Sequence, residues 1–225
     1  VIPRTGYIVE FNALWYNALK IMARLAEKYE NKQLCRKYLE MAEKTKKSFD
    51  EKFYNEEKHC LYDVLGDSKV RPNQLFALSL SHPIVDNAEI AEQVLNTVEN
   101  KLLNKYGLKT LSSDEDGYVD VYEGSAYRRD SSYHQGITWP WLLGLYYDAL
   151  KNTMIIEKNR TKRQELEEKI TKLVYTTKET FKAEMFERSS IGTISEIYDS
   201  TEPYEERGAF AQAWSVAEIF RIVLN

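Results

Sequence analysis

The sequence predicts an all-α protein in which successive helices alternate between an inner and an outer layer. Apolar residues recur at helical spacing over most of the 225-residue chain. The helical segments also alternate in character, because every second one carries a charged face while those between are apolar nearly all round. A helix that is apolar all round is buried on both sides, and one with a charged face lies outside. This alternation is typical of a double-layered helical barrel; it also fits an α-solenoid, although no fixed-period sequence repeat is visible.

Seven helices are expected, beginning and ending with an inner one. Their ranges are 7–30, 31–53, 72–81, 87–103, 137–152, 157–186 and 208–224. The first, third, fifth and seventh are apolar, with polar and aromatic residues near their starts, whereas the second, fourth and sixth are charged along one face. Pro72 suits the first turn of the third helix, and His82-Pro83 ends it.

Two long segments hold no clear helix. Residues 104–135 are rich in Gly, Asp, Ser and Tyr and are predicted to form a long loop with room for short strands, and residues 189–207 are predicted to form a second loop. Loops of this length are uncommon in compact domains and tend to carry function. Because both lead into inner helices, their ends should gather at one mouth of the barrel.

Composition argues against several functional classes. Lys+Arg number 31 against 35 Asp+Glu, and the net charge of -4 gives no electrostatic reason to bind nucleic acid or an anionic membrane. No apolar run reaches the roughly 18 residues that span a bilayer. Cys35 and Cys60 are too few for a disulfide framework and lack metal-ligand spacing, so a reduced cytoplasm is expected. The sequence has no nucleotide-binding glycine motif and its three histidines are scattered, so neither a cofactor nor a metal is expected.

The aromatic residues indicate a carbohydrate ligand. The chain has 16 Tyr and 4 Trp, and several stand among polar residues near the predicted helix starts rather than along apolar stripes. Most of the tyrosines are expected in the core, but aromatic rings also suit the apolar C–H faces of sugars. Carboxylates set among aromatics are typical of a glycosidase, in which one carboxyl acts as general acid and another as base or nucleophile.

Four segments combine such groups, and they lie at residues 4–19, at 70–74, at 127–141, and at 192–199 followed by 207–215. In the first, Glu10 either caps backbone amides at the positive end of a helix dipole or contacts a sugar, and both interpretations stay open. In the second, Arg71 and Asn73 are interpreted as structural. The third is the densest mix of charged, amide and aromatic groups and is interpreted as a ligand-binding lip. In the fourth, Glu196 lies between apolar residues in a Gly-edged loop, one acid among 35.

The same segments resemble, in this order, the bacterial and archaeal type of glycogen debranching enzyme. The matching stretches are RTGYIVEFNALWYNAL, LYDVLGDSKVRPNQLFALSL, YGLKTL, RRDSSYHQGITWPWLLG and ISEIYDSTEPYEERGAFAQAWSVAEIFR, which cover nearly the whole chain apart from the outer helices. The resemblance implies an (α/α)6 barrel that hydrolyses α-1,6-linked glucose at glycogen branch stubs with inversion of configuration. Glycogen or another branched α-glucan is then the expected partner.

The resemblance also implies a division of catalytic roles. The glutamate of the family's Ser-Glu-Ile segment falls on Glu196 and is the general base. The family's general acid is an aspartate in a Trp-Met-Asp segment, which should stand just before Ile2. That segment is not in this sequence, and the chain starts with Val1 rather than Met. Residues 1–225 are therefore expected to be the C-terminal part of one glucosidase domain, with helices six to twelve of the barrel, inactive alone and able to self-associate through an incomplete barrel edge.

The candidate sugar contacts are Trp15, Asp130, Tyr133, His134, Gln135, Trp139, Gln212 and Trp214. Two departures from the family pattern bear on the rim and so on substrate preference: Ser131-Ser132 replaces a more usual Gly-Ala, and residues 201–204 replace a segment that usually carries histidine. Two alternatives stay open. One is another (α/α)6 α-glucosidase of glucoamylase or trehalase type, and the other is a non-catalytic helical carbohydrate-binding or scaffold protein.

Overall fold

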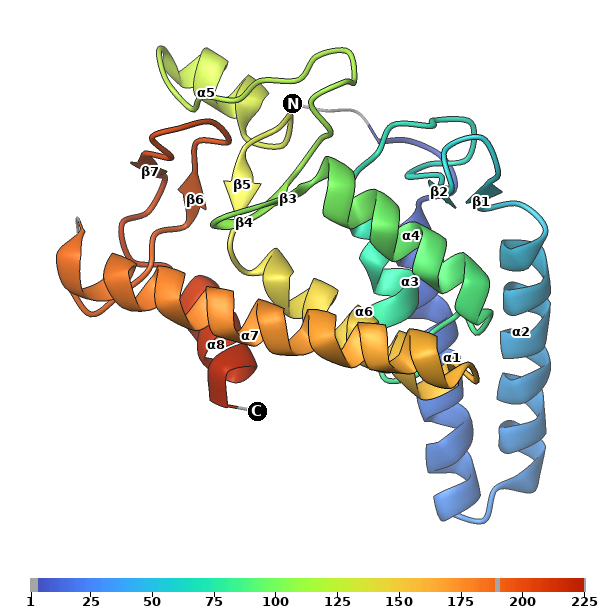
Figure 1. Ribbon diagram of the computed structural model, residues 1–225. Helices are drawn as coiled ribbons and strands as arrows, with labels where there is room; N and C mark the ends of the chain where they lie inside the picture. Colours follow the sequence, from blue (N-terminus) through green and yellow to red (C-terminus); the bar gives the residue numbers. More distant parts are fainter. Residues whose placement is uncertain (1–3, 189–190, 225) are drawn as a thin grey trace.

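A computed structural model describes residues 4–188 and 191–224 and shows a mostly helical molecule with a small amount of sheet (Figure 1). Val1 at the start of the chain, and Ser189 and Ser190 at the head of the second expected loop, lie outside the described residues. The all-α class expected from the sequence is confirmed. Within the described ranges, no helix is both long enough and apolar enough to cross a membrane.

The helices form two layers. The inner helices are α1 (Val9–Lys28), α3 (Phe76–Ser79), α6 (Leu142–Ile156) and α8 (Ala213–Leu224), and the outer helices are α2 (Lys32–Asp50), α4 (Ala88–Lys101) and α7 (Arg160–Glu187). α1 packs on α3, α3 on α6 and α6 on α8, so the inner helices follow one another in chain order. α2 covers α1, α4 covers α6, and α7 covers both α6 and α8. The predicted alternation is therefore confirmed.

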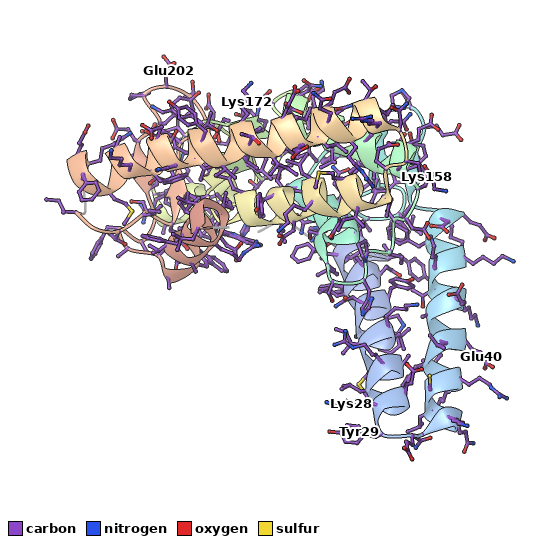
Figure 2. All side chains as sticks on the ribbon, turned by 60° about the horizontal axis from the view of Figure 1, so that its bottom comes forward. Lys28, Tyr29, Glu40, Lys158, Lys172 and Glu202 are labelled. Atoms are coloured by element: carbon purple, nitrogen blue, oxygen red, sulfur yellow. The ribbon has the colours of Figure 1, made fainter. Side chains whose placement is uncertain are left out.

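The burial of the helices explains these layers. α6 buries eight of its 15 residues, whereas α2 buries only Ala42 and Phe49 of its 19. α1 and α2 form a hairpin whose tip, at Lys28 and Tyr29, projects away from the rest of the molecule (Figure 2). Each outer helix begins after an asparagine whose side-chain oxygen accepts hydrogen bonds from the first turn, and these residues are Asn31, Asn87 and Asn159. Such caps satisfy backbone donors that a helix start leaves free.

A five-stranded antiparallel sheet lies at one end of the helical layers (Figure 1). Its strands, in both spatial and chain order, are β3 (Leu103–Asn104), β4 (Gly107–Lys109), β5 (Thr138–Trp139), β6 (Ile197–Tyr198) and β7 (Glu206–Arg207). A separate hairpin of β1 (Tyr54–Asn55) and β2 (Cys60–Leu61) follows α2. β4 comes from the first expected loop and β6 and β7 from the second, with β5 between them. The sheet therefore joins the two loops.

A short helix interrupts the first loop, where the sequence analysis expected none. α5 (Ala126–Ser132) begins after Ser125, whose hydroxyl accepts a hydrogen bond from the backbone N–H of Arg128. The segment has no apolar periodicity, and Ser132 is the residue of this helix that is buried. The helix therefore depends on its N-terminal cap and on the anchoring of its last turn, which a search for an apolar stripe does not detect.

Two inner helices begin later than expected. The fifth predicted helix starts at Leu142 rather than at residue 137, because Thr138 and Trp139 join the sheet as β5. The seventh starts at Ala213 rather than at residue 208, because Gly208 has a left-handed φ of +69° directly after β7. The third predicted helix consists of a 3-10 turn, η1 (Pro72–Leu75), that continues into α3.

The turn from the first loop into β5 requires glycine. Gly136 has a φ of +138°, and a Cβ there would lie 2.2 Å from the carbonyl oxygen of Val119 and 2.7 Å from the Tyr118 ring. The Gly136 N–H donates to Thr110 Oγ1 at 2.9 Å, and its carbonyl accepts from Ser200 Oγ at 2.5 Å. Because Ser200 belongs to the second loop, this turn sets how closely the two loops approach each other.

We expect Gly136→Ala to lower the free energy of unfolding by about 3 kcal/mol or more, because the new methyl group combines backbone strain with a clash against backbone atoms. Gly66→Ala is the matched control, since Gly66 has a φ of +89° but nothing within 4 Å of its added Cβ. The control should cost only about 1 kcal/mol. Urea unfolding followed by circular dichroism measures both values, and equal losses would contradict a close approach at Gly136.

Candidate active site

The Glu196 carboxylate is held by three hydrogen-bond donors. Its Oε1 accepts from the Tyr133 hydroxyl and from Gln212 Nε2, the latter at 3.3 Å. Its Oε2 accepts from the backbone N–H of Ala209 at 3.0 Å, and the backbone N–H of Glu196 donates in return to the Ala209 carbonyl at 2.8 Å. Glu196 is only partly buried. The carboxylate is therefore fixed in place and still open to solvent.

The β6–β7 hairpin explains why Glu196 and the segment after β7 meet. Glu196 directly precedes β6, Gly208 directly follows β7, and Ile197 pairs with Arg207 between them. A Cβ on Gly208 would lie 2.4 Å from Oε2 of Glu196 and 3.0 Å from Cγ1 of Ile197. Only glycine leaves the carboxylate room to reach the Ala209 N–H.

A row of aromatic rings stands beside the carboxylate. The Tyr133 ring meets the rings of Trp139 and His134 edge-on, with centroids 4.7 and 4.8 Å apart, and His134 stacks on Trp139 at 5.5 Å. Trp214 continues the row, 5.8 Å from Trp139 and stacked on Trp141 at 5.2 Å. Trp139 is buried, whereas Trp214 exposes 45% of its surface. The row therefore includes one ring, that of Trp214, that a ligand can reach.

A cleft of about 470 Å³ opens beside Tyr133, and it is lined by Arg4, Arg71, Asn73, Thr110, Asp130, Tyr133 and His134. This volume lies within the range of small-molecule binding sites. Three of the expected sugar contacts, Asp130, Tyr133 and His134, therefore share one cavity. Two larger hollows lie along α7 and beside the α1–α2 hairpin; the residues that line them are largely charged and do not include any expected site residue.

Buried charges form one wall of this cleft. Arg4 donates from Nε and Nη2 to the two carboxylate oxygens of Asp63, at 2.7 and 2.8 Å, and from Nη2 to Glu10 Oε2 at 2.7 Å. Asn73 Nδ2 donates to Glu10 Oε1 at 2.9 Å. Burial raises the pKa of Asp63, although the charges of Arg4 and Arg71 oppose the shift. The Glu10 side chain, for which two roles were open, thus binds Arg4 and Asn73.

Arg71, which lies in the same wall, forms hydrogen bonds with residues of the first loop. Its Nη1 donates to the carbonyls of Thr110 and His134 at 3.0 and 2.7 Å, and its Nη2 donates to Gln135 Oε1 at 2.5 Å. Arg71 and Asn73 therefore make structural contacts, although Arg71 binds carbonyls and an amide rather than clamping a carboxylate, and Asn73 binds Glu10 instead of capping its helix. Both also line the cleft. The Gln135 side-chain oxygen, expected at a sugar, is occupied by Arg71.

Three residues at the cleft were not predicted from the sequence. Arg4 and Thr110 line the cleft, and Asp63 binds Arg4. Arg4 and Asp63 stand near the starts of two of the matching stretches, RTG and LYD, among apolar neighbours. A charged residue in such a position needs a partner, and that is the signal that could have paired them. Trp15 lies on α1 with 50% of its surface exposed and is not among the residues that line the cleft.

Two titratable groups at the cleft, Tyr133 and His134, have shifted pKa values. Burial raises the pKa of Tyr133, and the hydrogen bond to the Glu196 carboxylate raises it further, so the hydroxyl remains a donor. Desolvation by the neighbouring rings lowers the pKa of His134, and the charge of Arg71 lowers it more, so the imidazole is neutral near pH 7. In the part of the chain that the structure describes, no cluster of three or more His, Cys, Asp or Glu side chains could hold a metal ion.

We expect Arg4→Met to lower the free energy of unfolding by about 3–5 kcal/mol near neutral pH, because it leaves Asp63 and Glu10 buried without their cation. Burial raises the pKa of Asp63 and Arg4 lowers it, so removing Arg4 raises this pKa further and the native variant binds more protons than the native wild type as the pH falls. The loss should therefore shrink as the pH is lowered from about 7.5 towards the ordinary carboxyl pKa of about 4.

Urea unfolding at both ends of that pH range measures the effect. Arg24→Met is the matched control, because Arg24 is an exposed arginine on α1. A loss that is equal at the two pH values, or equal in the two variants, would contradict the buried network.

Two comparisons with known proteins bear on this arrangement. A family model described as amylo-alpha-1,6-glucosidase matches residues 1–221, nearly the whole chain. A solved structure titled sialidase superposes with a TM-score of 0.68 at 13% identity, over 93% of this chain and 19% of that chain. The chain therefore spans about a fifth of the length of that protein, as the 19% coverage shows. At 13% identity, the likeness shows the fold alone.

Proposed function

This chain belongs to the amylo-alpha-1,6-glucosidase family of glycoside hydrolases, and from this premise we propose that it forms the base-bearing part of an inverting α-1,6-glucosidase. The observation that carries the proposal is the Glu196 carboxylate, which three donors hold in place and which Tyr133 joins to the lining of the cleft. A fixed carboxylate that still reaches solvent is suited to take a proton from water.

In the proposed reaction, a water oxygen attacks the anomeric carbon of the α-1,6-linked glucose while Glu196 takes the proton of that water. The bond from the anomeric carbon to the O6 oxygen of the main chain breaks, and that oxygen takes a proton from a general acid. We expect this acid to be the aspartate of the Trp-Met-Asp segment that the family resemblance implies. An inverting pair leaves roughly 6.5–9.5 Å between its carboxyls so that the water fits.

The groups around Glu196 are suited to bind a neutral ligand that is rich in hydroxyl groups. Asp130 and the neutral His134 are cleft groups that can bind sugar hydroxyls, and Trp214 offers an exposed ring for a sugar face. We propose glycogen or another branched α-glucan as the partner on this basis.

We also propose a cytoplasmic location for the enzyme, because Cys35 and Cys60 are free thiols, as is usual in a reducing compartment.

In the complete gene product that contains these residues, Glu196→Gln should lower kcat/KM on limit dextrin by roughly 100- to 10,000-fold, because an amide cannot take the proton. Glu40→Gln is the matched control, since Glu40 is exposed on α2, away from the cleft (Figure 2). Initial rates of glucose release measure both variants. Glucose release near the wild-type rate by the Glu196 variant would remove this residue from the role of base.

The configuration of the first product tests the inverting mechanism. Inversion at an α-linkage releases β-glucose, which then equilibrates in solution, because water attacks from the face opposite the leaving oxygen. Proton NMR in the first minutes of digestion should therefore show the β-anomer ahead of the α-anomer. If the α-anomer came first, Glu196 would instead act in a retaining mechanism.

A further inference from the structure

Tyr133 is the residue at which the two loops meet around the carboxylate. Its hydroxyl donates to Oε1 of Glu196, while its backbone stands at the C-terminal end of α5 in the first loop. We propose that Tyr133 is a positioning residue, which acts through Glu196 by holding the carboxylate in the orientation that accepts a proton from water. This inference rests on the proposed role of Glu196 and adds a residue that controls it.

The three donors leave one place on the carboxylate open. A carboxylate offers about four acceptor positions, and Glu196 uses three of them for Tyr133, Gln212 and Ala209. The Ala209 N–H bonds Oε2, and the Gln212 contact to Oε1 is long at 3.3 Å. Tyr133 therefore supplies, beside this long contact, the hydroxyl donor to Oε1. The fourth position remains for the water that the proposed reaction consumes.

Tyr133 is itself held from several sides. Its backbone N–H donates to the carbonyl of Arg129 at 3.0 Å, and its own carbonyl accepts from Trp139 Nε1 at 3.2 Å. Its ring packs against Trp139 and Tyr122, with centroids 4.7 and 5.7 Å away. Because Trp139 is buried and belongs to β5, the sheet rather than the loop alone sets where the hydroxyl points.

The hydroxyl is able to serve as a donor across the neutral pH range. Burial and the adjacent carboxylate both raise the pKa of Tyr133. The other ionisable groups around this pair are Tyr122, Asp130, His134, Arg4, Arg71 and the ion pair of Asp199 with Arg207, whose carboxylate accepts from the Tyr122 backbone. His134 is neutral near pH 7, and Arg4 and Arg71 are paired with buried carboxylates and carbonyls. The Tyr133 hydroxyl thus remains a donor to Oε1 at neutral pH.

The first test separates positioning from substrate binding by steady-state kinetics. In the complete gene product acting on limit dextrin, Tyr133→Phe should lower kcat by about 10- to 100-fold, the range expected for one hydrogen bond to a charged group, with KM nearly unchanged. Tyr29→Phe is the control, because Tyr29 lies at the tip of the α1–α2 hairpin (Figure 2) with 76% of its surface exposed, and it should keep the wild-type kcat. A raised KM at constant kcat would make Tyr133 a sugar contact and overturn the proposal.

The second test asks whether Tyr133 acts through Glu196. Adding Tyr133→Phe to the Glu196→Gln variant should cause no further loss of kcat, because the carboxylate to be positioned is gone. A further loss as large as in the wild-type background would overturn the proposal. Equal unfolding midpoints for Tyr133→Phe and wild type, measured in urea, would establish that the variant folds.

The third test is independent of activity. Carboxylate stretching bands of Glu196, isolated as the infrared difference between wild-type and Glu196→Gln protein, should shift in the Tyr133→Phe variant and not in Tyr29→Phe, because one hydrogen bond to the carboxylate is lost in the first variant alone. An unshifted band would overturn the positioning role. A shifted band together with an active Glu196→Gln variant would instead overturn the proposed base while leaving the Tyr133 contact in place.

Discussion

The hydrogen bonds that hold the Glu196 carboxylate depend on one short sheet that joins two loops far apart in the sequence. Thr138 of β5 pairs with Tyr198 of β6, and this pairing brings the Tyr133 hydroxyl and the Ala209 N–H to the same side chain. Strands of two or three residues are not stable by themselves. They persist here because α6 follows β5, α8 follows β7, and these two helices pack against each other. The inner layer of helices is therefore what makes the carboxylate geometry possible.

The second constraint is electrostatic. Arg4 and Arg71 face Glu10 and Asp63 in one buried wall, so the charges balance within the network. Burying ions is costly unless each one is paired and hydrogen-bonded, and here the carbonyls of Thr110 and His134 also accept from Arg71. A wall whose charges are already balanced offers hydrogen-bonding groups without attracting an ionic substrate. This property fits a neutral sugar better than a charged metabolite.

Family and fold give different kinds of information about this protein. The family match over residues 1–221 assigns the class of hydrolase, whereas the likeness to the solved sialidase, at 13% identity, assigns only the arrangement of helices. The same fold hosts different reactions because function resides in the groups that the loops present. For that reason, the proposed reaction rests on the hydrogen-bond donors around Glu196 and not on the arrangement of the helices.

The sequence by itself determined which helices are inner and which are outer, because burial on one or both faces leaves an apolar pattern at helical spacing, as in α6 and α2. It also located the loop that carries Glu196 and a lip from which Asp130, Tyr133 and His134 reach one cleft. It could not determine α5, which depends on an N-terminal cap and a buried last turn, or the short strands, which have too few residues for a pattern. Only the tertiary structure decided that Tyr133 binds Glu196 and that Gln135 binds Arg71, because those partners come from distant segments that helix packing brings together.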